Sequence, residues 1–404
     1  MTPPTAPHPA ENRKAPPPRG RSTTTRSRRP GRPASRPPAS PLRCGHARPP
    51  RAWIAPQLLD ARPAEHGPGR TVLVARLDGI GGVLLAGPAV RAVARTARRV
   101  VVLAGPRGGA AARLLPGADR VIEWCAPWID ADPPPVERAD VAALCAEVRT
   151  ERPDAALILT SSGQSPLPLA LLLRLAGVPW IGAVSTDYPG SLLDLRHRVP
   201  DGIPEAERML SLAEAAGYRL GADDPGRLAV RRPLPDTTAL TGPGGYVAVH
   251  VGASAPARGL PVSLAAETVA KLAAAGVRVV VTASAEHKAD AAAVAETGAL
   301  DLAGRTDLPE LADVLDRAAV LVAGNTGPAH LAAAVRTPVV SLFSPVVPAS
   351  AWAPYGTPLR LLGDQAERCA RTDARTCPVP GHPCLNSVTA DEVVHAVHEL
   401  MEDR

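Results

Sequence analysis

Short runs of Val, Leu, Ile and Ala recur along this sequence, and most are followed by a longer stretch with helical periodicity. In the first half, the runs predict strands at residues 71–75, 100–104, 120–124, 155–159 and 180–183. The stretches that follow them predict helices at 83–97, 109–115, 136–149, 166–176 and 204–217. Continuous apolar strands alternating with helices predict a doubly wound parallel sheet with helices on both faces.

The same alternation begins again after residues 233–245, a segment rich in Pro, Thr and Gly that we expect to be a linker. Further strands are predicted at 246–251, 277–282, 320–322 and 339–342, and helices at 262–275, 286–297, 308–318, 329–334 and 389–401. The pattern therefore predicts two Rossmann-like α/β lobes, at 71–235 and 244–388, and a closing helix within 389–404. Ligands of such sheets bind at the carboxyl ends of the strands, so we expect the site in a cleft between the lobes.

Residues 1–68 differ from the rest in composition, because they are rich in Pro, Arg, Ser and Thr. Too little apolar surface is available there to offset chain entropy, so we expect a disordered arm. Residues 1–70 carry 14 Arg and Lys against 3 Asp and Glu, roughly +11, which leaves roughly −5 for the remainder of a chain whose total is +6. A mildly acidic folded part argues against a nucleic-acid-binding protein, whereas the basic arm is suited to weak contact with an anionic membrane.

The sequence also predicts the cellular compartment and the state of the cysteines. The sequence has no apolar run of membrane-spanning length and no secretory signal, and its six cysteines are too scattered for a disulfide framework, so we expect a cytoplasmic protein. Cys369, Cys377 and Cys384 have no zinc-site spacing, and we expect them to be free or structural thiols. His197 is expected at the surface.

The strongest candidate site is the sequence Gly-Asn-Thr-Gly-Pro-Ala-His at residues 324–330, between a predicted strand and helix. Asn325 or Thr326 can cap that helix, and a proline near the first helical position favours a well-formed start. The free N–H groups there, including that of Gly327, can bind a diphosphate, and His330 lies one turn further on. We therefore predict that Asn325, Thr326, Gly327 and His330 bind a diphosphate.

Two other strand-to-helix turns are expected at the same cleft. Ser254 follows the strand at 246–251, and with Arg258 it could hold phosphate, although an ordinary surface loop explains these residues equally well. Residues 78–82, Asp-Gly-Ile-Gly-Gly, allow close approach of a ligand, or form only a tight turn. A dinucleotide-binding fingerprint does not fit these glycines, because the third glycine spacing is wrong and no acidic residue ends the second strand.

These stretches together resemble glycosyltransferase family 9, the heptosyltransferases, which adopt the two-lobed GT-B fold. The matching blocks are residues 74–91, 250–254, 302–308, 324–334, 337–343, 353–356 and 384–385, in family order. The resemblance implies an inverting transferase that needs no metal or other cofactor. It implies a nucleotide-sugar donor, often ADP-heptose in this family, with the diphosphate against Thr326, Gly327 and His330, and a glycan or lipid-linked acceptor reached from the cytoplasmic side.

One position departs from the family pattern. The first turn usually reads Gly-Asp-Val-Leu, and its Asp is the expected general base, but this chain has Gly82. A positioned base contributes ~10²–10⁴-fold to rate, so its loss would impair transfer unless another carboxylate replaces it. Asp78 is the nearest substitute by sequence, and Asp187 and Asp194 are more remote.

Two alternatives to a transferase therefore stay open. The chain could be a sugar-nucleotide-binding relative with little or no activity, because of Gly82. It could also be a nucleotide-sugar epimerase on the same two-lobed fold, for which Glu286 and Asp307 would be the second-lobe carboxylates.

Overall fold

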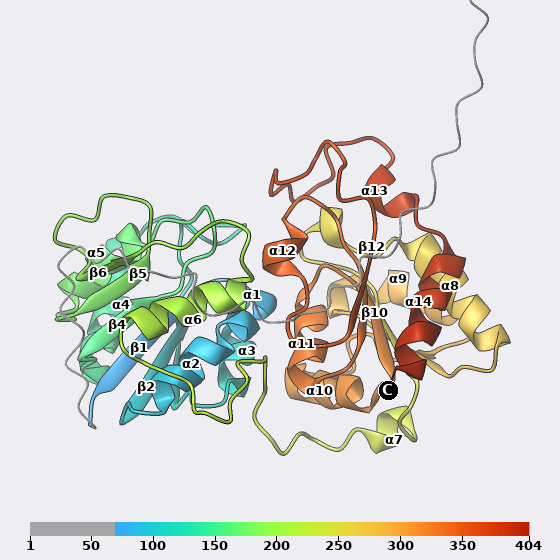
Figure 1. Ribbon diagram of the computed structural model, residues 1–404, viewed down its shortest axis with the longest axis horizontal. Helices are drawn as coiled ribbons and strands as arrows, with labels where there is room; N and C mark the ends of the chain where they lie inside the picture. The colour runs from blue at the N-terminus through green and yellow to red at the C-terminus, as the bar shows by residue number, and fades with distance from the viewer. Residues whose placement is uncertain (1–68, 404) are drawn as a thin grey trace, which may run out of the picture. The chain divides into compact units, whose positions relative to one another are not determined.

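Two parallel six-stranded sheets form the framework of the computed structural model, which describes residues 69–403 (Figure 1). The strand orders are β3-β2-β1-β4-β5-β6 and β12-β11-β10-β7-β8-β9. When the strands of the second sheet are renumbered from β7 as the first, its order is the same as that of the first sheet. Both sheets have the Rossmann order, in which the fourth strand returns to lie on the other side of the first. The predicted doubly wound fold is confirmed. The predicted arm at residues 1–68 lies outside the described residues.

The first sheet and its helices come from the first half of the chain. Its strands are β1 (Thr71–Arg76), β2 (Arg99–Ala104), β3 (Arg120–Glu123), β4 (Ala155–Ile158), β5 (Ile181–Val184) and β6 (Leu195–His197). Its helices are α1 (Ile80–Leu85), α2 (Gly87–Ala94), α3 (Gly109–Leu114), α4 (Arg138–Glu151), α5 (Leu167–Leu175) and α6 (Glu205–Ala215).

The second half builds the other sheet. Its strands are β7 (Val247–His250), β8 (Val279–Thr282), β9 (Leu300–Asp301), β10 (Val320–Gly324), β11 (Val339–Leu342) and β12 (Leu359–Leu362). Its helices are α7 (Thr238–Thr241), α8 (Val262–Ala274), α9 (Lys288–Ala295), α10 (Leu308–Arg317), α11 (Gly327–Val335), α12 (Ala349–Trp352), α13 (Pro383–Asn386) and α14 (Ala390–Glu402). Among the residues the structure describes, no helix is both long and apolar enough to cross a membrane.

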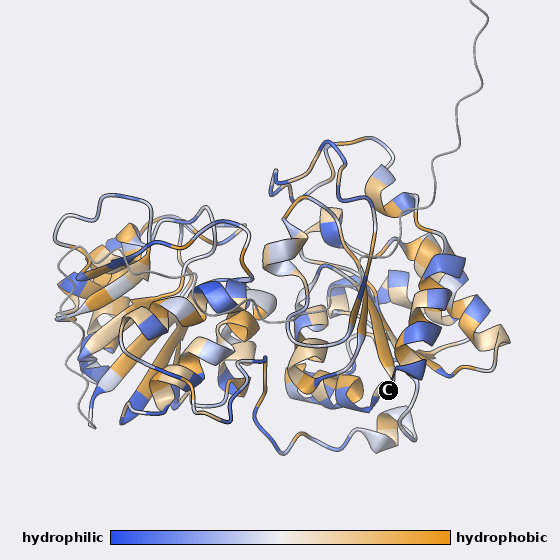
Figure 2. Cartoon of the chain, in the orientation of Figure 1, coloured by the Kyte–Doolittle hydropathy of each residue, from blue (hydrophilic) through white to orange (hydrophobic). Residues whose placement is uncertain are grey.

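Aliphatic side chains on both faces of each sheet make the core. All residues of β1 and β10 are buried, as expected for central strands covered by helices on two sides. The apolar colouring in Figure 2 follows the strands and the inner faces of the helices, and the polar colouring lies outside. With one Phe and four Tyr in the chain, this core depends on the close packing of Val, Leu and Ala.

Three local predictions differ from the structure. The helix predicted at 83–97 is two helices with a break at Ala86, because Pro88 has no N–H to donate to the preceding turn and its ring crowds it. Strands β6, β9 and β12 were not predicted, since each is short and contains a charged residue. The expected surface position of His197 is wrong: the ring is buried, 2.9 Å from the Ser211 hydroxyl, and burial and Arg208 lower its pKa to about 4.

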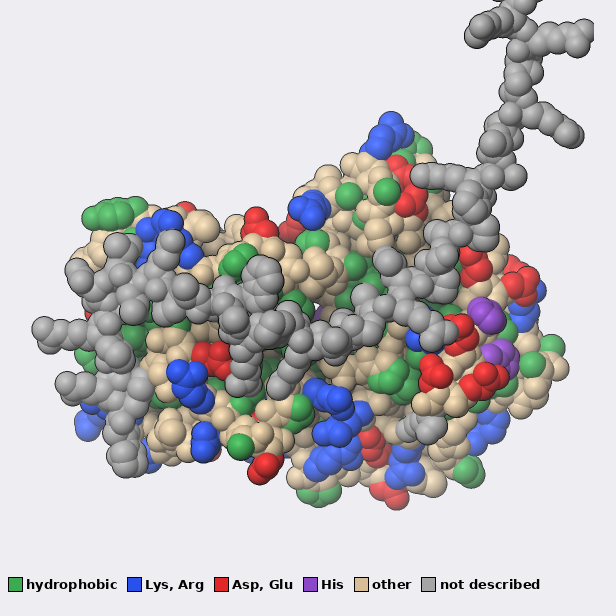
Figure 3. Space-filling view, in the orientation of Figure 1, with side chains coloured by type: hydrophobic (Ala, Val, Ile, Leu, Met, Phe, Trp, Pro, Cys, Tyr) green, Lys and Arg blue, Asp and Glu red, His purple; other side chains and the backbone are tan. Residues whose placement is uncertain are grey.

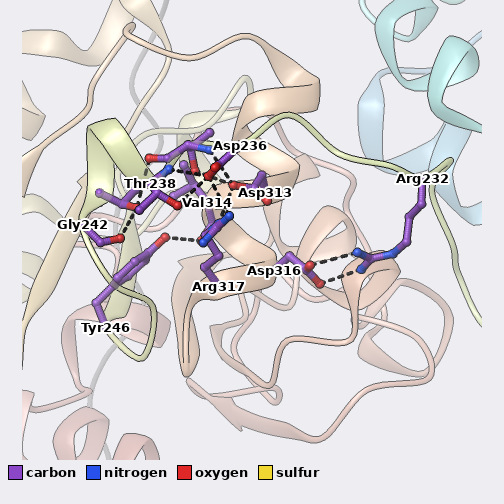
Figure 4. Close-up of polar contacts among 11 residues, drawn as sticks. Arg232, Asp236, Thr238, Gly242, Tyr246, Asp313, Val314, Asp316 and Arg317 are labelled. Atoms are coloured by element: carbon purple, nitrogen blue, oxygen red, sulfur yellow. Dashed lines mark hydrogen bonds and ion pairs between the residues drawn. The ribbon is translucent and has the colours of Figure 1, made fainter.

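The segment between the sheets is attached to both of them. Arg231 donates to the carbonyls of Leu114 and Leu115 in the first lobe, while Arg232 next to it forms a two-pronged ion pair with Asp316 on α10. Four residues further along, a second cluster holds the chain on the same helix (Figure 4).

Asp313 is the centre of this second cluster. Its carboxylate accepts hydrogen bonds from the N–H and hydroxyl of Thr237, at 2.9 and 2.6 Å, and from Arg317 at 2.7 Å. Burial alone would raise the pKa of Asp313, but the hydrogen bonds from Thr237 and Arg317 outweigh it and the net direction is down. The linker is therefore fixed to α10 by a buried carboxylate, one oxygen of which accepts three hydrogen bonds.

We expect Asp313→Ala to lower the free energy of unfolding by about 2 kcal/mol, because the buried donors of Thr237 lose their acceptor. Asp316→Ala is the matched control on the same helix, and its exposed ion pair predicts a loss of about 0.2–1 kcal/mol. Urea denaturation of both variants measures the difference. The contribution of Asp313 is present above the ordinary carboxyl pKa of 3.8 and is lost as pH falls through the lowered folded value. Equal losses in the two variants would contradict this assignment.

Candidate active site

Helix α11 starts at the carboxyl end of β10, in the centre of the second sheet. Thr326 is its N-cap residue, in extended conformation, and no side chain caps the helix. Pro328 in the first turn has no N–H to be satisfied. This positive, uncapped end of a nine-residue helix is suited to an anionic ligand.

Two buried side chains at this helix start have polar atoms without a partner. Nδ2 of Asn325 and Nδ1 of His330 are buried and make no hydrogen bond, although the two residues are only 8% and 4% exposed. Burial lowers the pKa of His330 to about 4, so its ring is neutral at neutral pH and carries one N–H. Buried polar groups are nearly always paired, and two unpaired ones at one helix start indicate a place prepared for a polar ligand.

The loop after β7 lies directly against this start. The carbonyl of Arg258 accepts a hydrogen bond from the N–H of Asn325 at 3.0 Å, and a Cβ on Gly324 would lie 2.2 Å from that carbonyl oxygen. The approach therefore requires glycine at position 324. The Arg258 guanidinium forms an ion pair with Asp373, and its Nε has no partner. Ser254 lies at the exposed tip of the same loop.

In the first sheet, Asp78 follows β1 and is held by three side chains. Its carboxylate lies 2.7 Å from Nε of Arg76 and accepts hydrogen bonds from the Ser161 hydroxyl at 3.1 Å and the Gln164 amide at 2.9 Å. Its side chain keeps 20% of its surface exposed. Gln164 also lines a small cavity beside Asp78, with Leu77 among its walls.

Gly82 and Asp78 compete for the same space. A Cβ at position 82 would lie 2.7 Å from Cβ of Asp78 and 3.2 Å from Nε of Arg76. An aspartate at 82 would thus meet the arginine that Asp78 now uses. Arg76 is fully buried and lies between Asp78 and a second buried carboxylate, Glu205, at 3.5 Å.

The two helix starts, α1 and α11, are in contact. A Cβ at Gly81 would lie 2.6 Å from the His330 ring, and a Cβ at Gly327 would lie 3.0 Å from Cβ of Ile80. Two glycines therefore permit the approach that brings the Asp78 turn beside the uncapped end of α11. On the same side, the guanidinium of Arg76 lies 5.9 Å from the Trp352 ring centre.

The structure thus brings together most of the residues that the sequence singled out, and gives other roles to the rest. Asp187 accepts a hydrogen bond from Ser165 at 2.6 Å, and Asp194 is bound by Arg174 and the N–H of Ile181. Asp307 caps α10, which gives this carboxylate a structural role.

Several residues of the site were not found by sequence reasoning: Arg76, Ser161, Gln164, Glu205 and Asp373. Ser161 and Gln164 follow the end of β4, where polar residues after a buried strand are a usable signal. The sequence holds no comparable signal for Glu205 or Asp373.

The late cysteines are free. Cys369 and Cys384 are buried and Cys377 partly so, and burial raises the pKa of the Cys384 thiol to about 11. Within residues 69–403, no cluster of His, Cys, Asp and Glu is arranged to hold a metal ion.

Comparison with known proteins gives a family match. The family model described as glycosyltransferase family 9 (heptosyltransferase) matches residues 141–382, more than half of the chain. A 42-residue stretch is 50% identical to lipopolysaccharide heptosyltransferase 3 of Escherichia coli K12, and it spans 10% of this chain and 12% of that protein.

Solved structures agree with this fold. An ADP-heptose lipopolysaccharide heptosyltransferase II of E. coli matches with TM-score 0.63 and 21% identity, over 82% of this chain and 99% of that one. A family 9 glycosyltransferase of Veillonella parvula matches with TM-score 0.65 and 15% identity, over 85% and 100%. The E. coli heptosyltransferase WaaC, solved with ADP-2-deoxy-2-fluoro heptose, matches with TM-score 0.60 and 20% identity, over 81% and 99%. At these identities the similarity establishes the fold alone.

Proposed function

The chain belongs to glycosyltransferase family 9, and from that premise we propose that it transfers a heptose-like sugar from a nucleoside-diphosphate sugar to a hydroxyl acceptor. One observation carries the proposal: the unpaired polar atoms of Asn325 and His330 lie at an uncapped helix start that meets the Asp78 turn. By analogy with the WaaC complex, the donor is ADP-heptose-like.

The donor diphosphate binds at the start of α11. The backbone of Thr326 and Gly327 faces it, and Asn325 and His330 donate the N–H groups that have no partner in the protein. Arg258 and Ser254 border the same place from the loop after β7. Negative charge grows on the diphosphate as its bond to the sugar breaks, and a fixed helix start stabilises that charge where other enzymes use a divalent ion. The proposed transfer is therefore metal-independent.

Asp78 is the proposed general base. The acceptor hydroxyl oxygen attacks the anomeric carbon from the face opposite the diphosphate, so the new C–O bond forms as the old one breaks and the configuration inverts. The hydroxyl proton moves to Asp78, which is partly exposed and already oriented by Arg76, Ser161 and Gln164. A carboxylate offers about four lone-pair sites, so three bound donors leave room for the acceptor.

The competing proposal is a sugar-nucleotide-binding protein with little or no transfer activity, and Gly82 favours it. Both proposals predict nucleotide-sugar binding, but only the transferase is expected to form a glycosylated product. An epimerase is less well supported, because Asp307 is engaged as a helix cap.

A panel of nucleoside-diphosphate sugars, with glycan and lipid-linked acceptors, tests the proposed activity by mass spectrometry of the products. We expect ADP-heptose-like donors to add one sugar to the acceptor, and EDTA to leave the rate unchanged within about twofold, because the helix start replaces the metal. Nucleotide binding without any product would favour the inactive relative. Failure to bind any nucleoside diphosphate would reject both proposals.

We expect Asp78→Asn to lower kcat by about 10²–10⁴-fold because the base is lost, while nucleotide affinity is retained because the diphosphate site of the second lobe is unchanged. Asp187→Asn is the comparison, and a loss of activity there in place of Asp78 would assign the base to Asp187.

A second experiment moves the carboxylate to position 82. The double variant Asp78→Gly/Gly82→Asp should recover part of the activity lost in Asp78→Gly, because it removes the 2.7 Å Cβ contact and keeps Arg76 as partner. Full activity of Asp78→Asn would exclude this base.

We also propose that the acceptor is presented at an anionic membrane surface. The basic composition of residues 1–68 supports this, as do the exposed side chains of Leu171 and Leu175 on α5, at 48% and 63%, and of Tyr188, at 85%. Figure 3 shows hydrophobic and Arg or Lys side chains close together at the upper left. Small apolar patches beside positive charge bind anionic interfaces.

Sedimentation with vesicles tests this contact. We expect binding to phosphatidylcholine vesicles that contain 30% phosphatidylglycerol, weakening between 0.1 and 0.5 M salt, and little binding to phosphatidylcholine alone. Leu171→Ser/Leu175→Ser should reduce binding, whereas Leu300→Ser, a similarly exposed leucine of the second lobe, should not. Equal binding to both kinds of vesicle would contradict the electrostatic contribution.

A further inference from the structure

The segment between β12 and α13 places a carboxylate on the arginine of the proposed donor site. Asp373 forms an ion pair and a hydrogen bond with the Arg258 guanidinium. The backbone of Arg258 is hydrogen-bonded to Asn325, the residue that precedes the N-cap of α11. The backbone of Arg258 therefore connects the ion pair to the helix start at which the donor diphosphate is proposed to bind.

The segment does not need this ion pair to stay in place. The N–H of Asp373 donates to the carbonyl of Val346 at 2.9 Å, and the N–H of Ala257 donates to the carbonyl of Arg375 at the same distance. Arg375 also donates to the carbonyl of Ser254 at 2.7 Å. Two backbone contacts and one side-chain contact thus hold the segment, and the carboxylate of Asp373 can leave Arg258 without moving it.

The two partners of the ion pair have unequal surroundings. The side chain of Arg258 is 25% exposed, and burial lowers its pKa, with Asp373 acting in the opposite direction. The side chain of Asp373 is 79% exposed. An exposed carboxylate contributes little to an ion pair, whereas a largely buried guanidinium with an unpaired Nε is costly to leave without an anion.

A guanidinium binds carboxylate and phosphate with the same set of donors, and a diphosphate carries more charge than one carboxylate. A phosphate that binds Arg258 would thus have to compete only with the weakly held carboxylate of Asp373. Asp373 also has φ of 54°, a left-handed conformation that Asp and Asn tolerate better than most residues.

Resting on the proposed donor site, we propose that Asp373 is a built-in competitor for the donor phosphate. Its carboxylate occupies Arg258 while the site is empty and is displaced when the nucleoside diphosphate binds. Arg258 therefore stays paired in both states, and Asp373 weakens donor and product binding alike, which favours release of the nucleoside diphosphate after transfer.

Titration calorimetry with ADP on the full chain tests this inference. Asp373→Asn keeps the shape and the backbone preference but removes the charge, and we expect the Kd for ADP to fall about three- to fivefold. Asp364→Asn, an exposed aspartate of the same segment, is the matched control and should leave the Kd unchanged. In an Arg258→Gln background, Asp373→Asn should have no effect, because the competition needs the arginine.

The outcomes separate this inference from the proposed function. If the native chain binds ADP and Asp373→Asn leaves the Kd unchanged, the competitor role is overturned while the donor site stands. A weaker Kd in Asp373→Asn also overturns it and assigns Asp373 a direct contact with the donor. If neither protein binds ADP or another nucleoside diphosphate, the donor site itself fails, and the inference fails with it.

Discussion

The contact between two strand-to-helix turns is the constraint on which the site depends. Gly81 lies against the ring of His330, and Gly327 lies against Ile80, so neither turn has room for a side chain at the point of approach. This contact brings a carboxylate of the first lobe beside the uncapped helix of the second. A side chain at either glycine would have to displace His330 or Ile80 and would separate the two turns.

The buried polar groups around this contact are arranged in two different ways. In the first lobe, Arg76 has carboxylates on two sides and Asp78 accepts hydrogen bonds from Ser161 and Gln164, although Nε of Arg76 and Oε2 of Glu205 make no hydrogen bond. In the second lobe, Asn325 and His330 keep unpaired atoms. The unpaired atoms of Arg76 and Glu205 lie in ion pairs, whereas Asn325 and His330 form none, and a buried polar group without any partner indicates where a ligand can bind. The asymmetry supports acceptor activation in one lobe and donor binding in the other.

Much of the fold could be predicted from the sequence, because apolar strands and Ala-rich helices alternate with a clear period. The helix start at Thr326 could also be located, since Gly, Thr and Pro at fixed offsets determine such a turn. Ser161 and Gln164 follow a predicted strand, but their pairing with Asp78 could not be predicted, because it depends on β4 lying beside β1. Glu205, which pairs with Arg76, comes from a distant helix without a comparable signal. His197 was misplaced for a similar reason, as it lies on a three-residue strand whose pattern is too short to read.

The attachment of the linker has a mechanical consequence. Arg231 is bound to the first lobe and Arg232, its neighbour in the chain, to the second. Because the two attached residues are adjacent, no free length of chain lies between the two attachment points. Any displacement of this segment from one lobe would therefore have to break the hydrogen bonds of Arg231 or the ion pair of Arg232.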